Sequence, residues 1–477
     1  MADIKEINSA KLEIVMFPWL AMGHLIPFFH LSKLLAQKGH RIHFVSTPRN
    51  LSRLPKIPLH LSSQMTLVSF PLPPVPNLPP QAESSMDVPY NHQQLLKQAF
   101  DSLRPPLTEL LRRLNPDWVI YDYASHWLPA AAAGAGRRIS CAFFSLFTAA
   151  TISFTGAAGF VDSRSRAEDF TVAPDWVPFE SDVAYRLHEI TKYVEKTEED
   201  SSGPSDQIRF SVAMEESDAV IVRSSPAFEP DWFDLLDRIH EKRIVPVGFL
   251  PPVTGEESDE GGSAVWGEIK EWLDEQRVNS VVYVALGTEV SLTREEIAEL
   301  AMGLEKSGLP FFWALRRYAA GSTRDAAAML PGGFVERVAG RGIVYTEWAP
   351  QVKILSHDSV GGFLTHCGCN SVVEGLAFGK VLILLPMIND QGLNARLLAG
   401  KKLGMEIPRR DDDGSFTGDS VAATVTAAMV EESGEPWRSA VKAAKETFGD
   451  GEKNDRLVDN LANYLQDMKM GFCKKTI

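Results

Sequence analysis

Cysteine is scarce in this sequence, and an apolar leader is missing. Only four of the 477 residues are cysteines: Cys141, Cys367, Cys369 and Cys473. Four thiols in so long a chain are too few for a disulfide framework, which favours a reducing compartment. Charged residues at five of the first thirteen positions interrupt what would be the apolar part of a secretion signal. We therefore expect a cytoplasmic protein.

Excess positive charge is also lacking. The chain has 48 Lys and Arg against 62 Asp and Glu, a formal net charge of −14. Such a surface repels phosphate backbones and anionic lipids at long range, so we expect neither nucleic acid nor a membrane as partner. One uncharged stretch, residues 139–160, is long enough to span a bilayer, but hydroxyl side chains and glycines are spread through it. It predicts a core strand followed by a loop or helix that lines a pocket.

Two cofactor signatures are missing as well. Neither half of the chain carries Gly-x-Gly-x-x-Gly after its first predicted strand, which argues against a dinucleotide-dependent oxidoreductase. Cys367 and Cys369 have no second pair at zinc spacing, so we interpret them as structural thiols. The run 411–413 of three aspartates lies in a polar, glycine-flanked stretch and is interpreted as surface. We expect no metal and no bound cofactor.

What the sequence does contain is an alternation of short apolar runs and amphipathic stretches, in two halves. Residues 12–17, 25–35 and 41–46 predict strand, helix and strand, the unit of a parallel sheet. The alternation restarts after a stretch near residue 250 that is rich in proline, glycine and acidic residues. At roughly 100–200 residues per domain, the length fits two α/β domains, and a ligand is expected between them at the carboxyl ends of the strands. Further strands are predicted at 118–121, 142–144, 280–286, 311–315 and 342–346.

Residues 348–391 hold the most informative pattern. A buried strand is predicted at 360–365 and a short helix at 372–378, joined by the turn His366-Cys367-Gly368-Cys369-Asn370-Ser371. Asn370 and Ser371 are residue types that cap helix N-termini, where free amides bind anions. Glu374 follows one helical turn later, placed to accept hydrogen bonds from sugar hydroxyls. A diphosphate joined to a sugar fits this combination.

The same stretch closely resembles the signature of plant UDP-sugar-dependent glycosyltransferases. Trp-Ala-Pro-Gln, His-Cys-Gly-x-Asn-Ser, Glu-Gly and a final Asp-Gln stand in the order and at the spacing of that family. The likeness extends along the whole chain, and most strongly to the branch that includes sugar-on-sugar transferases. It implies the GT-B fold, two Rossmann-like domains facing a cleft. The domains would be an acceptor domain at 1–247, a linker at 248–265, a donor domain at 266–455, and a C-terminal helix at 456–477 that packs back on the acceptor domain.

The resemblance also implies roles for individual residues. His24 matches the family's catalytic base and Asp122 its partner. Trp348 would stack on uracil, Gln351 would bind the ribose or the base, and Asp390 with Gln391 would read the transferred sugar. Donor-binding roles are implied in all for Thr288, Trp348, Ala349, Gln351, His366, Gly368, Asn370, Ser371, Glu374, Asp390 and Gln391. For the acceptor, we expect a pocket wall at Met86, Pro89, Phe144, Ser145 and Thr148.

One position departs from the family pattern. Cys369 stands where the family has a tryptophan that lines the sugar site, so a tryptophan at this position should restore that wall if the space is empty. The expected activity is an inverting transfer of glucose from UDP-glucose to a hydroxyl of a flavonoid, terpenoid, phenol or glycoside by a monomeric enzyme. A nucleotide-sugar epimerase, and a UDP-sugar-binding protein whose turnover is impaired by Cys369, remain alternatives.

Overall fold

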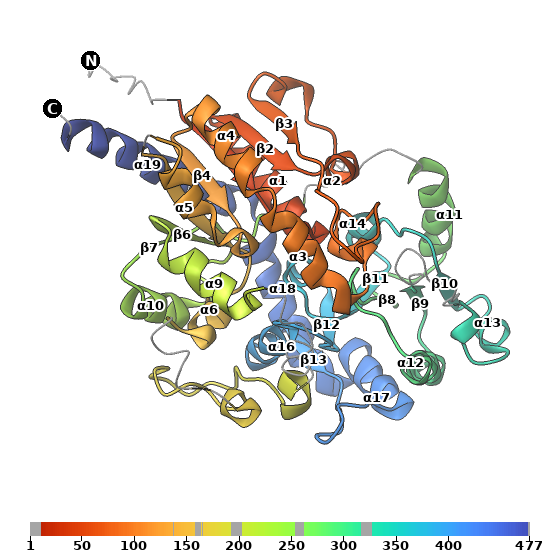
Figure 1. Ribbon diagram of the computed structural model, residues 1–477. Coiled ribbons are helices and arrows are strands. Elements are labelled where there is room, and N and C mark those ends of the chain that lie inside the picture. Colours follow the sequence, from red (N-terminus) through yellow and green to blue (C-terminus); the bar gives the residue numbers. More distant parts are fainter. Residues whose placement is uncertain are drawn as a thin grey trace, which may run out of the picture.

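The computed structural model describes residues 11–136, 138–157, 164, 166–191, 203–252, 262–315 and 327–475. These residues form two parallel β-sheets, each covered by helices on both faces, as Figure 1 shows. The α/β class and the two-sheet architecture predicted from the alternating pattern are confirmed. The strands of the first sheet run in the order β3-β2-β1-β4-β5-β6-β7. Those of the second run in the order β10-β9-β8-β11-β12-β13.

The first sheet separates two apolar cores. Its strands are β1 (Glu13–Phe17), β2 (Arg41–Ser46), β3 (Met65–Ser69), β4 (Trp118–Tyr121), β5 (Ser140–Ser145), β6 (Ala219–Val222) and β7 (Arg243–Pro246). Side chains alternate along each strand, so Ile14 and Met16 enter one core while Val15 and Phe17 enter the other. Helices from this half of the chain are α1 (Met22–Gln37), α2 (Pro48–Arg53), α3 (Gln93–Asp101), α4 (Arg104–Leu114), α5 (Leu128–Ala133), α6 (Ala149–Thr155), α9 (Asp206–Glu215) and α10 (Pro230–Ile239).

The second sheet is built in the same way. Its strands are β8 (Val281–Ala285), β9 (Phe311–Ala314), β10 (Gly342–Tyr345), β11 (Val360–Thr365), β12 (Val381–Leu384) and β13 (Gly404–Glu406). Val282 and Val284 face one core, and Val281 and Tyr283 the other. The helices of this half are α11 (Gly262–Asp274), α12 (Arg294–Ser307), α13 (Phe334–Arg337), α14 (Gln351–Ser356), α15 (Cys369–Ala377), α16 (Gln391–Gly400), α17 (Gly418–Met429), α18 (Glu435–Gly449) and α19 (Gly451–Lys475).

Each sheet has one point where the strand order reverses, between β1 and β4 in the first and between β8 and β11 in the second. Crossover connections leave in opposite directions at such a point and open a crevice at the carboxyl ends of the two strands. His24 comes shortly after β1, and Asp122 comes directly after β4. Thr288 and His366 follow β8 and β11 in the same way. The topology therefore places predicted site residues at both crevices.

The last helix, α19, lies against the first sheet although its sequence follows the second. Val458, Leu461 and Leu465 are buried in the core that also holds residues of α1 and β1. The indole Nε1 of Trp118 in β4 donates to the carbonyl oxygen of Leu465 at 3.1 Å. Helix α19 contacts α1 and β7 and lies on the face of the first sheet opposite to α5.

The chain crosses between the two halves twice, and the crossings touch. The backbone N–H of Phe249, in the first crossing, donates to Asn454 Oδ1 at 2.6 Å, in the second. The rings of Phe249 and Phe448 stack with centroids 4.0 Å apart. Gly248 has φ +73, and a Cβ there would lie 2.1 Å from Asn454 Oδ1, so only glycine fits this contact.

The uncharged stretch 139–160 folds within the first half, as predicted, in its described part. It forms the central strand β5 and then helix α6, whose Thr151, Phe154 and Thr155 line a cleft; residues 158–160 lie outside the described residues. Within the described ranges, no helix is both long and apolar enough to cross a bilayer.

The predicted helix at 372–378 needs correction. Helix α15 starts at Cys369, and its N-cap is Gly368, whose carbonyl accepts the N–H of Ser371 at 2.6 Å and of Val372 at 3.1 Å. Asn370 and Ser371 thus lie inside the first turn and are not caps. The error arose because both residue types favour caps, whereas here glycine supplies the extended backbone that a cap requires.

Candidate active site

A cleft of about 1030 Å³ lies between the two halves of the chain. Its wall includes His24 and every residue predicted to bind the donor: Thr288, Trp348, Ala349, Gln351, His366, Gly368, Asn370, Ser371, Glu374, Asp390 and Gln391. These residues come from five separate parts of the chain, which follow β1, β8, β10, β11 and β12, so the fold brings them together. Aromatic side chains of the first half complete the wall, among them Tyr90, Tyr123, Phe147, Phe154, Tyr185 and Phe210.

His24 and Asp122 form a hydrogen-bonded pair at the first crevice. Nδ1 of His24 lies 2.7 Å from Asp122 Oδ2; the His24 side chain is 19% exposed and the carboxylate 2%. The backbone N–H groups of Trp19 and Tyr123 also donate to Asp122, at 3.0 and 2.7 Å. These donors fix the carboxylate behind the ring. They leave Nε2 of His24 as the ring nitrogen for a ligand in the cleft.

The surroundings of His24 favour its protonated form. Burial alone would lower the His24 pKa, but the charge and hydrogen bond of Asp122, with Glu289 and Asp390 further away, raise it above the ordinary value. Asp122 is the largest of these favourable influences. An imidazole with such a partner accepts a proton readily, as a general base must.

His366 lies in a cradle formed by two glycines. A Cβ on either Gly287 or Gly368 would lie 2.5 Å from His366 Nε2, so both positions must stay bare for the ring to fit. Nδ1 of His366 is buried and has no hydrogen-bond partner among the described residues. Burial lowers the His366 pKa to about 4, so the ring is neutral near pH 7. An orphaned ring nitrogen beside the N-terminus of α15 indicates that a ligand completes the site.

Gln351, Glu374 and Ser371 are connected by hydrogen bonds further along the cleft. Nε2 of Gln351 donates to Glu374 Oε2 at 2.6 Å and more weakly to Ser371 Oγ at 3.4 Å. The hydroxyl of Tyr283, a residue that the sequence analysis missed, donates to Gln351 Oε1 at 3.2 Å. The indole of Trp348, 60% exposed, lies at the same end of the cleft.

Cys369, Asp390 and Asn394 pack together in the second half of the chain. Cys369 Sγ lies 3.7 Å from Asp390 Oδ2 and 3.5 Å from Asn394 Nδ2, and Asn394 Nδ2 also donates to Asp390 at 2.7 Å. Burial raises the pKa of the Cys369 thiol and of the Asp390 carboxyl. Gln391 holds the neighbouring loop, because its Oε1 accepts the N–H groups of Met387 and Ile388.

The residues predicted for the acceptor pocket lie near the cleft but not on its wall. Phe144 is fully buried, with its ring centroid 4.8 Å from that of Phe28. Thr148 caps α6 by accepting the N–H of Thr151 at 3.1 Å. Met86, Pro89 and Ser145 are likewise absent from the lining, which passes through Tyr90, Leu146, Phe147 and Thr151.

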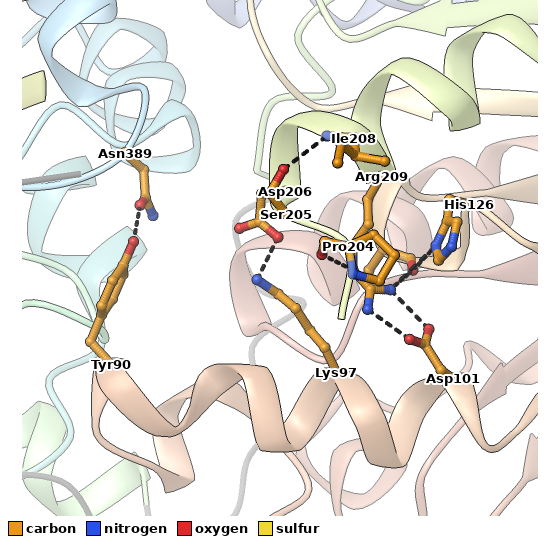
Figure 2. A network of polar contacts seen from close by, with 11 residues as sticks. Tyr90, Lys97, Asp101, His126, Pro204, Ser205, Asp206, Ile208, Arg209 and Asn389 are labelled. Atoms are coloured by element: carbon orange, nitrogen blue, oxygen red, sulfur yellow. Dashed lines mark hydrogen bonds and ion pairs between the residues drawn. The ribbon is translucent and has the colours of Figure 1, made fainter. Parts of the chain in front are cut away.

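A network of polar contacts fixes the side of the cleft formed by the first half of the chain, as Figure 2 shows. Lys97 and Asp101, both on α3, bind Asp206 at 2.5 Å and Arg209 at 2.6 Å, so two ion pairs hold the start of α9. From the turn before α3, the hydroxyl of Tyr90 donates to Asn389 Oδ1 of the other half at 2.8 Å. The ion pairs join α3 to α9, which lie far apart in the sequence, and only the contact of Tyr90 with Asn389 depends on how the two halves meet.

Cysteine and carboxylate positions do not form a metal centre in the described part of the chain. No group of three or more His, Cys, Asp or Glu side chains there is placed to hold an ion. Cys141, Cys367 and Cys369 are free thiols. The three aspartates at 411–413 are exposed, and Asp412 pairs with Arg410 at 2.8 Å.

Comparison with known proteins identifies relatives along the full chain. Residues 10–205 match the family model "Glycosyltransferase, N-terminal domain", and residues 264–412 match "UDP-glucoronosyl and UDP-glucosyl transferase". The chain is 58% identical to UDP-glycosyltransferase 91C1 of Arabidopsis thaliana, over 95% of this chain and 96% of that protein. It is 38% identical to soyasaponin III rhamnosyltransferase of Glycine max, over 97% of each.

Solved structures share the fold. The crystal structure of Arabidopsis thaliana UGT89C1 with UDP-L-rhamnose is similar with a TM-score of 0.74 and 26% identity, over 96% of this chain and 100% of that one. The structure of Glycyrrhiza uralensis UGT73P12 with glycyrrhetinic acid 3-O-monoglucuronide has a TM-score of 0.78 at 20% identity, over 98% of each chain. The second likeness concerns the fold alone.

Proposed function

Because the chain belongs to the plant UDP-glycosyltransferase family, we propose that it transfers glucose from UDP-glucose to a hydroxyl of a small-molecule acceptor, with inversion at the anomeric carbon. One observation carries the assignment of the catalytic base. The His24–Asp122 pair lies at one crevice of the cleft, opposite the cradle of His366 and the N-terminus of α15 at the other.

In the proposed reaction, the neutral His24 accepts the acceptor's proton on Nε2 as its oxygen attacks the anomeric carbon. Nδ1–H donates to Asp122, which fixes the tautomer and stabilises the imidazolium that forms. The new bond joins the acceptor oxygen to C1, and the bond from C1 to the phosphate oxygen breaks. UDP leaves with the electron pair, so an α-linked donor gives a β-glucoside.

The donor side stabilises the charge that grows on UDP. We assign this role to the first-turn amides of α15, to Thr288 and to His366, whose ring is neutral and carries a hydrogen-bond donor. The Asn370 side chain already donates to Gly23 through Nδ2 and accepts from Arg223 through Oδ1, so its backbone N–H is the group left for the diphosphate. Trp348, Ala349, Gln351 and Glu374 would hold the uridine.

Asp390 and Gln391 would bind the hydroxyls of the glucosyl group. They follow β12 at the edge of the cleft that also holds His24, and Asp390 lies close enough to influence the His24 pKa. For the acceptor, the aromatic wall formed by Phe147, Phe154 and Phe210 favours a large apolar body. A flavonoid, a terpenoid, a phenol or one of their glycosides fits this description, and the protein is expected to act in the cytoplasm as a monomer.

The test is turnover with UDP-glucose and a panel of such acceptors, followed by mass spectrometry of products and by UDP release. We expect glucosides from the wild type and a loss of about 10²- to 10⁴-fold for His24→Ala on an aliphatic hydroxyl, with UDP affinity retained. Conversion of UDP-glucose into another UDP-hexose without an acceptor would show an epimerase instead. Binding of UDP-glucose without product across the panel would show a binding protein.

A further inference from the structure

Arg223 is a buried cation that the functions assigned above leave unexplained. It directly follows β6, at the carboxyl end of the first sheet, and lines the cleft although only 7% of it is exposed. Its Nε donates to the carbonyl oxygen of Phe249 at 2.8 Å, and its Nη1 donates to Asn370 Oδ1 across the cleft. No carboxylate of the described residues lies within ion-pair distance of it.

The other buried arginines of the described chain are paired. Arg209 makes two hydrogen bonds to the carboxylate of Asp101, at 2.8 and 2.6 Å, which Figure 2 shows. Arg396 pairs with Glu189 at 2.6 Å and with Glu406 at 3.3 Å. Arg223 has only a carbonyl and an amide oxygen as partners, and burial lowers its pKa to about 10. A buried charge without a counter-ion is costly unless an anion arrives.

The surroundings of Arg223 indicate which anion this is. Asn370 lies in the first turn of α15, so the guanidinium reaches the helix end where free amides already favour negative charge. Cys369, the neighbouring residue, lines the same two cavities as Arg223. Its side chain is small, whereas the family's usual residue at this position is a tryptophan.

We infer that Arg223 binds the diphosphate of the UDP-sugar, as a positive charge supplied to the donor by the acceptor half of the protein. The inference rests on the proposed function and deepens it. When the bond from C1 to the phosphate oxygen breaks, the leaving UDP gains a negative charge, and Arg223 stabilises this charge together with His366 and the amides of α15. No proton leaves the guanidinium in this step.

A purely structural role is the competing explanation. Arg223 also connects Phe249, in the crossing between the halves, to Asn370, and it would orient α15 even without touching the donor. The two roles differ in what they demand of the ligand. Losing a contact with the diphosphate weakens the binding of UDP but not that of uridine. A change in the arrangement of the cleft weakens the binding of both.

The experiment compares UDP and uridine binding by calorimetry for the wild type, Arg223→Met and Arg223→Lys. We expect the Met variant to lose roughly 10- to 100-fold in UDP affinity, the range for a hydrogen bond to a charged group, and to bind uridine within about twofold of the wild type. The Lys variant should retain part of the difference in affinity between UDP and uridine. The dependence of UDP affinity on salt concentration should become shallower in the Met variant.

Lys33→Met is the matched control, because Lys33 is a cation of the same half that lines the same cleft, over the ring of Phe29. Equal losses for Lys33→Met and Arg223→Met would overturn the inference, since they would show a general effect of charge. Equal losses for UDP and uridine, or no loss at all, would overturn it as well. If Arg223→Met fails to fold, Arg223→Lys decides, because it keeps a positive charge and a structural role predicts equal changes in the affinity for UDP and for uridine.

These outcomes separate the inference from the proposed function. A wild type that binds neither UDP nor uridine would overturn both. A wild type that binds UDP and makes glucosides, with an Arg223→Met variant that retains full UDP affinity, would overturn the role of Arg223 alone.

Discussion

Asn370 on α15 donates its Nδ2 hydrogen to the carbonyl oxygen of Gly23 at 3.0 Å. The first turn of a helix in the second half of the chain therefore touches the residue that precedes His24. This contact fixes the distance between the end of the cleft that we assign to the diphosphate and the histidine that we assign as base. Since the acceptor oxygen must reach the anomeric carbon and His24 together, the distance matters for the rate.

The Asp122→Asn variant should change the pH dependence of turnover. Burial lowers the His24 pKa, but Asp122 together with Glu289 and Asp390 raises it above the ordinary histidine value. Because the base works only when neutral, the acid limb of the wild-type kcat/KM profile, where the rate falls as the pH drops, should lie above that ordinary value. Without the carboxylate charge, burial dominates, so this acid limb should move to lower pH. The maximal rate should drop about 10²- to 10⁴-fold as support for the imidazolium is lost.

A pH series of kcat/KM for wild type and variant is the measurement. Glu289→Gln is the matched control, because Glu289 contributes a smaller influence of the same sign. The acid limb of the kcat/KM profile should also move to lower pH in Glu289→Gln, but by less than in Asp122→Asn. An unchanged limb in Asp122→Asn would contradict the assignment of His24 as base.

The Gly368→Ala variant should weaken UDP binding through His366. The backbone at Gly368, with φ −66, accepts alanine, but the new Cβ would lie 2.5 Å from His366 Nε2 and must displace the ring. We expect a loss of about 1.5–3 kcal/mol in UDP affinity, the value of a hydrogen bond to a charged group. Calorimetry with UDP is the measurement, and His366→Ala should give a similar loss.

The double variant Gly368→Ala/His366→Ala makes this prediction stricter. Once His366 is alanine, the substitution at 368 has no ring to displace and should cost little more. Gly400→Ala, where no heavy atom outside its own helix lies within 4 Å of the added Cβ, should bind UDP as the wild type does. Additive losses in the double variant would show that Gly368 acts without His366.

The Cys369→Trp variant should destabilise the protein and weaken UDP-glucose binding. Asp390 and Asn394 lie within 3.7 and 3.5 Å of Cys369 Sγ, so the position beside the sugar site is filled rather than empty. Forcing a large ring into a packed site costs about 1–3 kcal/mol. The measurements are thermal unfolding and the KM for UDP-glucose, with Cys369→Ser as the control of similar volume. A lower KM at unchanged melting temperature would show that the indole finds free space.

The Leu461→Ala variant should destabilise the fold without touching the cleft. Leu461 on α19 is fully buried in the core that contains α1 and β1. Replacing a buried leucine by alanine costs about 2–5 kcal/mol. Denaturant unfolding followed by fluorescence of the buried tryptophans is the measurement, and the exposed Asn460→Ala is the control. Equal stability of the two variants would show that α19 contributes little to this core.

The sequence predicts the strands of both sheets where a buried apolar run stands before a helix, as at β1, β2, β8 and β11. The short strands β6, β7 and β13 and the edge strand β3 were not predicted. β3 is half exposed and β13 has only three residues, so neither carries a strong apolar pattern.

The residues of the site likewise fall into those that the sequence predicts and those that it does not. His24, Asp122 and His366 each follow a strand, so their neighbourhood could be inferred from topology and the signature. The contacts of Tyr90 with Asn389, of Asn394 with Thr151 and of Asn370 with Gly23 depend on how the two halves of the chain meet, which no local pattern encodes. Arg223 did carry a signal: it is a charged residue directly after a buried strand, at the sheet edge where ligands bind.

The contact between Phe249 and Asn454 has a consequence for motion. Since the chain passes between the halves twice and both passages meet at this hydrogen bond, the two connections are tied to each other at one point. A rotation of one half against the other would strain this link between the connections, and it would also break contacts across the cleft such as that of Asn370 with Gly23. Gly248, whose conformation and lack of a side chain let the two passages touch, is therefore needed for this link although it lies outside the cleft.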